Sequence, residues 1–426
     1  MLINPAAIFS KLGNPNSLIP LAIKDASATA GMTAGSFVTG KEEGVDRFID
    51  EAGTEVIWLF GIPAFKWIFD NTVLRAMKLD SKFDPRNLKD KDVFEKIKEY
   101  APTEEIKQGI EKIGKNQKSF KFAAGAKFAV SIGMTVLTYL GLTKAKQKYT
   151  ENKIRKNLIA EFQAKKDEEE KQQNASGEVS FKGVGQTLEN FVFSPVKNMW
   201  LLDGCIATER LSNSRSPQEF TGYLIKEGLF FAFMYLIGGQ IQNTMESRAN
   251  NKLHKNIGLD ARVLEGETLR TAFENGSVEK SLAEFNAANT SDADLYEFLH
   301  KNPDNLVVKA AKQSDIIRMY KKTDKIDSRK YIDLKEVKGV ESKIRELYSQ
   351  YKAAIEKGDT AEKFFKGVKK LKRKSILTNI GSSILVLGII TPALMLLTRL
   401  ANGKDDTEFH TKKQIRDQLI QEGIIA

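Results

Sequence analysis

The sequence predicts an all-α integral membrane protein with about four membrane helices in two weakly related two-helix repeats, plus a helical domain outside the bilayer. One observation is the segment 375–398, which contains no charged residue. At about 1.5 Å rise per residue, a helix of this length reaches roughly 36 Å and crosses a hydrocarbon core of about 30 Å. The others are three shorter apolar runs between charged segments, and a sequence without the sustained apolar–polar alternation typical of strands.

Composition limits the partners. The mean hydropathy of −0.34 shows that charged segments outweigh the apolar ones, and the formal net charge is +11. A basic excess is typical of proteins that bind nucleic acid or anionic lipid. Because most lysines and arginines flank the apolar runs, we expect the lipid bilayer with its anionic headgroups as a partner, and not nucleic acid. The single cysteine and three widely separated histidines predict neither a disulfide nor a metal site, and no cofactor is expected.

The N-terminal part predicts a closely packed helix. The stretch from Ala22 to Gly35 is rich in small residues, which allow two helices to approach closely. Residues 35–41 also match GxxxxGK, the start of a phosphate-binding loop. However, Glu42 stands where a Ser or Thr must hold magnesium, and no buried strand precedes the motif. We therefore interpret this motif as a turn.

Residues 56–73 form the first expected membrane segment. Its strongly apolar side chains contribute roughly −4 kcal/mol to insertion, while Lys66 near its middle costs about 3 kcal/mol. Gly61 and Pro63 predict a kink. The segment can span with the help of neighbouring helices, re-enter the bilayer or lie in the interface, and all three interpretations stay open. Lys66 is a candidate functional residue, since charges within a membrane often serve function. The alternative is a lysine that snorkels to the headgroups.

Residues 128–143 form the second expected span, between Lys127 and Lys144. A charged loop with two short helices, capped by Asp90 and Thr103, precedes it. One face of the span carries small residues four or eight positions apart, a pattern that favours close packing of membrane helices. These residues are Gly125, Ala129, Gly133 and Gly141.

We expect a charged helix over 144–173 and a linker over 174–186. The third apolar run is 228–245. Residues 246–374 then predict several amphipathic helices, one of them capped at Ser291. They form a helical domain outside the bilayer that offers a surface to a protein partner. This domain ends in a basic group that we expect at the lipid surface: Lys366, Lys369, Lys370, Lys372, Arg373 and Lys374.

The two halves of the chain, 1–173 and 187–426, follow one plan. In each half an aromatic apolar run is followed by a polar loop, a lysine-rich approach and a second span, which makes the duplication parallel. The halves carry acidic residues at corresponding places: Asp25 and Asp203, Glu51 and Glu227. Lysines and arginines at both ends of the two loops place these loops in the cytoplasm. Four spans form a thin bundle, which suggests a homo-oligomer.

The segment RFIDEAGTEVIWLFGIPAFKWIFD, Arg47 to Asp70, resembles part of the uncharacterised multi-pass membrane proteins of gut-associated bacterial relatives of cyanobacteria. The resemblance covers roughly the first 75 residues. It implies a location in a bacterial inner membrane, and it carries no known activity or site residues.

Three functions stay open. A non-enzymatic structural, anchoring or interaction protein is favoured, because no catalytic constellation is visible and the domain at 246–374 is large. A transporter or channel subunit is suggested by the duplication, by Lys66, and by interruptions at Gly61–Pro63 and Gly238–Gly239. A membrane-bound enzyme is the third, since Asp25 and Asp203 recur near membrane segments and paired carboxylates can perform acid–base chemistry.

A soluble protein is the alternative architecture. The runs 56–73, 128–143 and 228–245 can be read as buried core helices of a large α-domain. Only 375–398 resists this interpretation strongly, because a soluble helix of that length normally shows a polar stripe.

Overall fold

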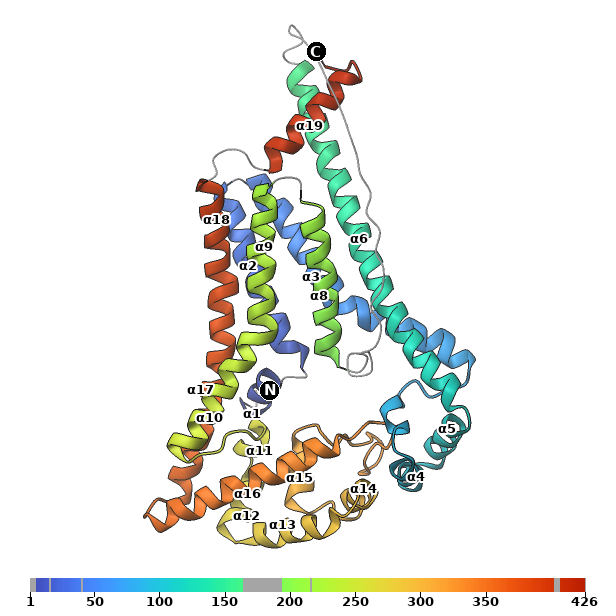
Figure 1. The fold of residues 1–426 in the computed structure, drawn as a ribbon, viewed down its shortest axis with the longest axis vertical. Coiled ribbons are helices and arrows are strands. Elements are labelled where there is room, and N and C mark those ends of the chain that lie inside the picture. Colours follow the sequence, from blue (N-terminus) through green and yellow to red (C-terminus); the bar gives the residue numbers. More distant parts are fainter. Residues whose placement is uncertain are drawn as a thin grey trace. The chain divides into compact units, whose positions relative to one another are not determined.

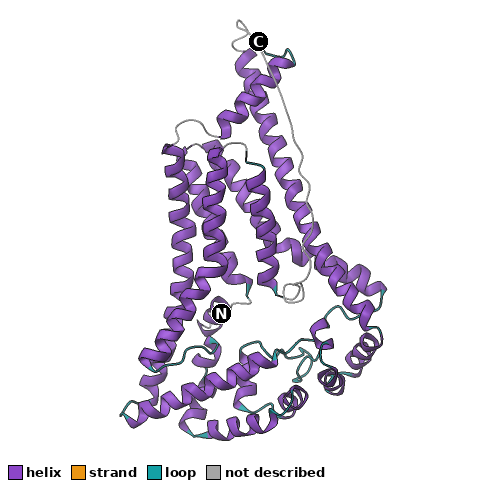
Figure 2. Ribbon diagram, in the orientation of Figure 1, coloured by secondary structure: helices purple, strands orange, loops and turns teal. Residues whose placement is uncertain are grey.

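The computed structural model describes residues 5–14, 17–39, 41–163, 194–214, 217–401 and 407–425. These residues are almost entirely helical (Figure 1 and Figure 2), and their one β contact is an isolated bridge between Met319 and Ile326. The all-α class is therefore confirmed. The predicted linker 174–186 and the end of the charged helix 144–173 lie outside the described residues.

The chain divides into two compact units, each assembled from segments that are far apart in the sequence. Unit 1 contains Met1–Pro20, Lys66–Ala129 and Gly238–Gly381. Unit 2 contains Leu21–Phe65, Val130–Ile237 and Ser382–Ala426. Both predicted polar loops therefore belong to unit 1.

Unit 1 consists mainly of short helices. They are α1 (Pro5–Gly13), η1 (Asp70–Leu74), η2 (Pro85–Leu88), α4 (Lys91–Glu99), α5 (Glu104–Lys115), α10 (Ile237–Leu253), α11 (Ala261–Glu265), α12 (Glu267–Glu274), α13 (Ser277–Ala288), α14 (Asp292–Lys301), α15 (Leu306–Gln313), α16 (Leu334–Glu356) and most of α17 (Ala361–Leu385).

Three helix starts predicted in unit 1 are confirmed. Side chains of Asp90, Thr103 and Ser291 each accept a backbone N–H from the first turn of α4, α5 and α14, at 3.0, 3.3 and 3.0 Å. Each contact satisfies a donor that has no partner within its helix. The predicted amphipathic helices thus begin where local chemistry favours a start.

One apolar core joins the two polar loops of the sequence. Ile97, Ile110 and Ile113 come from the first loop, and Leu299 and Ile344 come from the second, each at most 1% exposed. At about 25 cal/mol per Å² of buried apolar surface, such side chains are the main source of stability in unit 1. The domain predicted at 246–374 therefore shares its core with the loop before the second apolar run.

Unit 2 consists of longer helices. They are α2 (Leu18–Thr39), most of α3 (Lys41–Phe69), most of α6 (Gln117–Gln163), α8 (Pro195–Ser212), α9 (Pro217–Phe231), η3 (Ala232–Leu236), η4 (Val386–Ile390), α18 (Thr391–Ala401) and α19 (Thr407–Gln421).

The close packing predicted for the small-residue helix is confirmed within unit 2. A Cβ added to Gly31 in α2 would lie only 2.0 Å from the carbonyl oxygen of Gly388 in η4. The two backbones therefore touch, which only glycine permits at this position. Gly35 lies inside the same α2 helix, so the residues before Thr39 do not form a phosphate-binding loop.

Three described helices are long and apolar enough to cross a membrane: Gln117–Ala160, Phe220–Leu253 and Ala361–Thr398. They contain the predicted segments 128–143, 228–245 and 375–398. Only 33%, 28% and 33% of the residues in their most apolar stretches are buried inside the chain. Apolar helices with so much uncovered surface do not fit the soluble alternative, and they indicate a membrane location. The segment 56–73 is not among the three.

The predicted helix interruptions are wrong. α3 continues through Gly61 and Pro63, and α10 continues through Gly238 and Gly239. A Cβ on Gly61 would lie 2.6 Å from Thr135 Cγ2, so this glycine permits close packing of α3 on α6. The irregular turns are instead the π-helical turns η1, η3 and η4.

Candidate functional site

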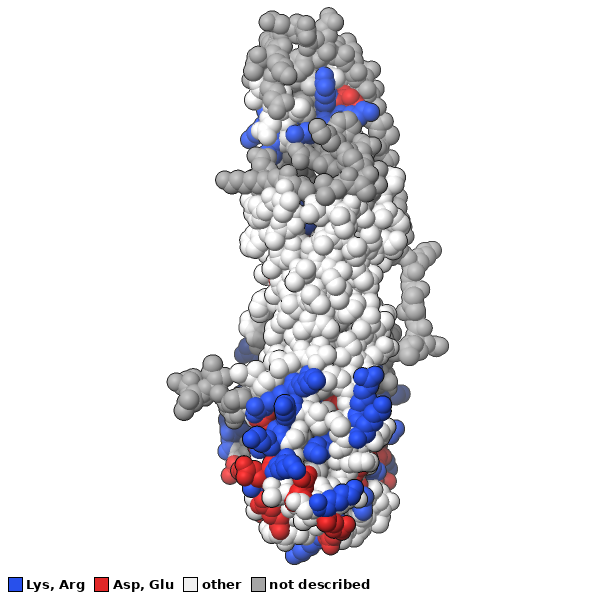
Figure 3. All heavy atoms as spheres, turned by 90° about the vertical axis from the view of Figure 1, so that its left-hand side faces the viewer, with Lys and Arg blue, Asp and Glu red and all other residues white. Residues whose placement is uncertain are grey.

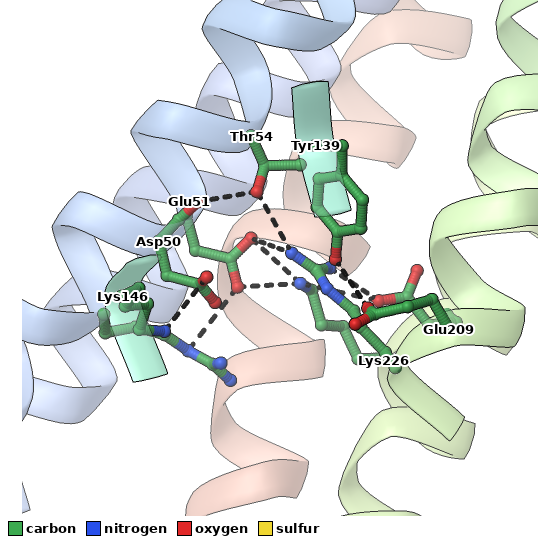
Figure 4. A network of polar contacts seen from close by, with 10 residues as sticks. Asp50, Glu51, Thr54, Tyr139, Lys146, Glu209 and Lys226 are labelled. Carbon is green, nitrogen blue, oxygen red and sulfur yellow. Dashed lines mark hydrogen bonds and ion pairs between the residues drawn. The ribbon is translucent and has the colours of Figure 1, made fainter. Parts of the chain in front are cut away.

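The interior of unit 2 contains charged side chains from four helices, α3, α6, α8 and α9 (Figure 4). We call them the ionic cluster. It has four basic and four acidic members: Arg47, Lys146, Arg210 and Lys226, with Asp50, Glu51, Glu209 and Glu227. Four of these residues, Glu51, Arg210, Lys226 and Glu227, are at most 7% exposed.

Glu51 lies at the centre of the ionic cluster. The Lys226 ammonium donates to both of its carboxylate oxygens, at 2.7 and 2.9 Å. The guanidinium groups of Arg47 and Arg210 approach the same carboxylate at 3.5 and 3.8 Å. One carboxylate therefore faces three cations.

Glu227 is the second acceptor of the same cations. Arg210 donates to its Oε1 at 2.8 Å, and the Lys226 ammonium lies 3.6 Å from that oxygen. Two carboxylates and two cations thus form a closed ring in which each cation contacts both anions. Glu51 and Glu227, which we predicted to correspond in the two halves, meet in this ring.

The remaining contacts extend the ionic cluster toward α6. Lys146 pairs with Asp50 at 2.9 Å, and the Tyr139 hydroxyl donates to Glu209 at 3.0 Å. Thr54 donates its hydroxyl to the Asp50 carbonyl at 2.7 Å. The Tyr139 hydroxyl therefore helps to satisfy the charge of Glu209, and the Thr54 hydroxyl accepts from the Arg210 guanidinium at 3.5 Å.

Helical spacing explains how these residues reach one interior. Arg47 and Glu51 are one turn apart on α3, so they share a face. Lys226 and Glu227 are neighbours on α9, and both are buried because the polar side of that helix points inward. Removing charges from water costs several kcal/mol per ion, so a buried ion pair adds little net stability. Lys146, Lys226 and Glu227 lie in helices that are long and apolar enough to cross a membrane, and ionisable residues in such helices are functional candidates.

Asp25 and Asp203, both predicted as candidate functional residues, belong to unit 2. Asp203 in α8 is 5% exposed and accepts a hydrogen bond from the Tyr235 hydroxyl in η3. The two aspartates lie within electrostatic range of each other. Lys24, which precedes Asp25, is 3% exposed and donates to the Phe233 carbonyl at 3.2 Å.

Lys66 belongs to unit 1 and lies near the end of α3. Its ammonium is within electrostatic range of Lys127 and Asp70, which form an ion pair at 2.5 Å. The candidate functional residues of the sequence therefore separate, with two in unit 2 and Lys66 in unit 1.

The predicted helix-packing face of α6 is not covered by the part of the chain that the structure describes. Nothing described lies within 4 Å of a Cβ added to Gly125, Gly133 or Gly141, and Ala129 is exposed. Close packing of this face onto another membrane helix stays a prediction. Among the described residues, Gly31, Gly61 and Gly388 are glycines at which helices do pack closely within the chain.

The predicted lipid-surface residues divide into two groups. Lys369, Lys372 and Arg373 are engaged inside unit 1, where they donate to Glu265 or Glu246 at 3.0 Å or less. The other three, Lys366, Lys370 and Lys374, are exposed and four positions apart. Figure 3 shows a long stretch of surface with almost no charged side chain, and a separate part on which Lys and Arg gather.

Outside the membrane helices, His300 in α14 is the strongly perturbed histidine. Its ring contacts those of Tyr100 and Tyr296, and each of the two centroid distances is 4.8 Å. Burial, with a smaller effect from Lys312, lowers the pKa of His300 to about 4. Its Nε2 atom is buried and makes no hydrogen bond to a described residue.

Sequence reasoning missed Arg210 and Lys226 as members of a site. The available signal was weak, since Lys226 and Glu227 stand directly before an apolar run and Arg210 stands in a charged segment. Among the described residues, no three His, Cys, Asp or Glu side chains come together as metal ligands. No family model, curated protein or solved structure matches this chain.

Proposed function

We propose that this chain is a non-enzymatic integral membrane protein that anchors a helical interaction domain at the cytoplasmic face of a bacterial inner membrane. The observation that carries the proposal is the single apolar core of unit 1, built from both polar loops. A pair of mere connecting loops would not need a shared core. The bacterial location has its support in the resemblance of the segment from Arg47 to Asp70 alone.

Specific polar contacts support a fixed arrangement of the two loops. The Asp84 N–H donates to the Arg329 carbonyl at 2.8 Å, and Asn87 donates to the Ser328 carbonyl at 3.3 Å. Lys96 in α4 forms an ion pair with Glu297 in α14. Loops that share a core lie on one side of a bilayer, which supports four spans in a parallel duplication.

Anionic lipid is the partner that we propose for the exposed lysines of α17. Lys366, Lys370 and Lys374 lie on one helix face, directly before the uncharged segment 375–398. A basic residue near an anionic membrane surface contributes about 1 kcal/mol. Replacing all three by glutamine is expected to lower the stabilisation of the intact protein by anionic over zwitterionic lipid.

The test of anchoring uses the full chain in cell membranes. A cysteine at Lys280, which is well exposed, in a Cys205→Ala background should react with an impermeant reagent in inverted vesicles and not in intact spheroplasts. A photocrosslinker at Lys280 should capture a discrete protein partner, and one at the exposed Leu137 in α6 should capture lipid. A chain that carbonate extracts from membranes, or a unit 1 surface without protein adducts, would contradict the proposal.

A transport function is the second candidate, and the ionic cluster favours it. An anchor has no use for a ring of buried charges that costs desolvation, whereas transport sites are built from such groups between membrane helices. Proteoliposomes that contain the full chain should show a flux of an ion or small solute across the bilayer, and Glu51→Gln should abolish this flux. The matched control is Glu422→Gln, which removes the half-exposed partner of Arg155 in the same unit. Equal flux with and without the protein would exclude this candidate.

A further inference from the structure

Asp203 lies outside the ionic cluster, and its environment differs from that of the acidic residues in the cluster. It is 5% exposed, and the hydroxyl of Tyr235, a neutral group, donates a hydrogen bond to it. The indole N–H of Trp58, from α3, is directed at the same carboxylate but lies outside hydrogen-bonding geometry. Trp58 is 1% exposed, so its N–H has no access to solvent.

The charged neighbours of Asp203 are acidic. Asp25 from α2 and Glu227 from α9 both lie within electrostatic range. Within the described residues, neither Asp203 nor Asp25 forms an ion pair. A buried carboxylate next to like charges, with no paired cation, is strongly disfavoured in its ionised form.

The nearby cations are directed at other acceptors. Lys24 donates to the Phe233 carbonyl at 3.2 Å, which also accepts from the Ser383 hydroxyl at 3.3 Å. Phe233 lies in the π-helical turn η3, where the altered hydrogen-bond pattern frees carbonyls for such donors. Arg210 donates to Glu227. Neither cation therefore neutralises Asp203.

We propose that Asp203 is a proton-binding site in the interior of unit 2. The proton binds to the carboxylate and forms a carboxylic acid, and the hydrogen bond with the Tyr235 hydroxyl holds that group in place. A proton fits this site better than a metal cation, because no cluster of three metal-ligating side chains is present among the described residues. The inference deepens the transport candidate, for which the proton would be the coupling ion.

Infrared spectroscopy of the full chain in lipid tests the site independently of flux. The protein at neutral pH should show the carbonyl stretch of a protonated carboxylic acid, with a shift on exchange into heavy water. Asp203→Asn should remove one carboxyl's share of this band. Glu209→Gln is the matched control, because Glu209 also binds a tyrosine hydroxyl but is half-buried and belongs to the ionic cluster. It should leave the band unchanged.

Tyr235→Phe keeps Asp203 in place and tests the same assignment if Asp203→Asn fails to fold. Loss of the hydroxyl should shift the carbonyl band without removing it. A wild-type spectrum without the band, an Asp203→Asn spectrum that keeps it, or a Tyr235→Phe spectrum with an unshifted band would overturn the proposal. A band that follows these expectations in a protein without flux would support the site and exclude transport.

Discussion

Unit 1 and unit 2 distribute charge in opposite ways. Unit 1 buries an apolar core and carries most of its charges outside. Unit 2 buries Glu51, Arg210, Lys226 and Glu227 and exposes large apolar side chains such as Leu137. The difference shows which solvent each unit meets, because exposed carbon is favourable in lipid and exposed charge is favourable in water.

The comparison also separates stability from function. In unit 1 the buried groups are the source of stability, so the unit has the organisation of an ordinary soluble domain. In unit 2 lipid is as apolar as a leucine side chain, so close packing and polar contacts hold the helices together. Loss of a buried polar contact should therefore lower the free energy of unfolding more in unit 2 than in unit 1.

The largest effect is expected for Glu51→Gln in unit 2. The substitution leaves Lys226, Arg47 and Arg210 facing an amide, and removal of one buried partner typically costs about 3 to 5 kcal/mol. Glu422→Gln, at the half-exposed pair with Arg155, should cost less than about 1 kcal/mol. Reversible unfolding of the full chain in mixed micelles would measure both. Equal costs would show that the interior of unit 2 is wet.

Gly31→Ala should follow, with a cost of about 1 to 3 kcal/mol or more from overpacking. Its Cβ would lie 2.0 Å from the Gly388 carbonyl oxygen, and neither backbone can yield as a side chain does. Gly133→Ala on the uncovered face of α6 is the matched control and should be neutral in the isolated protein. If the wild-type chain forms a dimer and Gly133→Ala weakens the association of its two copies, that result would instead support the predicted homo-oligomer.

Acid should weaken unit 1 through His300. Its pKa is lowered to about 4 by burial, against about 6.5 in an unfolded chain. The unfolded state therefore binds a proton that the folded state refuses. The free energy of unfolding of unit 1 is therefore unaffected by His300 above about pH 6.5. It declines as the pH falls toward 4, by on the order of 2 to 3 kcal/mol.

His300→Phe should remove most of this dependence, because a phenyl ring fits the same stack and does not titrate. His254→Gln, at an exposed histidine, should preserve it. Limited proteolysis of unit 1 across pH 4 to 7 provides the measurement. A wild-type protein with the same sensitivity at both ends would contradict the buried, neutral state of His300.

The smallest effect is expected for Ser291→Ala, which removes the cap of α14 in unit 1. The loss of this cap should cost about 1 kcal/mol. Ser281→Ala, in the middle of α13 and without a hydrogen bond from its hydroxyl to a described residue, should be neutral. Thermal unfolding of the full chain compares the two. A cap effect as large as that of Glu51→Gln would erase the contrast between the units.

Features that depend on neighbours in sequence were predictable. Asp90, Thr103 and Ser291 could be predicted as helix caps because their partners are two or three residues away. The segment 375–398 could be predicted as a membrane helix from its composition alone. The small residues around Gly31 likewise announce close packing, although not its partner in η4.

The ionic cluster could not be predicted, because it joins residues far apart in the chain. Lys226 and Glu51 are separated by 175 positions, and the sequence contains many other acidic and basic residues that remain exposed. Lys66 was predicted as a candidate because it is a charge in an apolar run, yet the buried ring of charges lies in unit 2 and does not contain it. Periodicity identifies the polar side of a helix, but it does not say which helix faces that side.

The shared core of unit 1 has a consequence for biosynthesis. Ile97, Ile110 and Ile113 leave the ribosome long before Leu299 and Ile344 exist. At about 5 to 20 residues per second, their apolar partners arrive only on the order of tens of seconds later. These apolar side chains must therefore be protected from aggregation until residues in the last third of the chain have been translated. The insertion machinery or a chaperone can provide that protection.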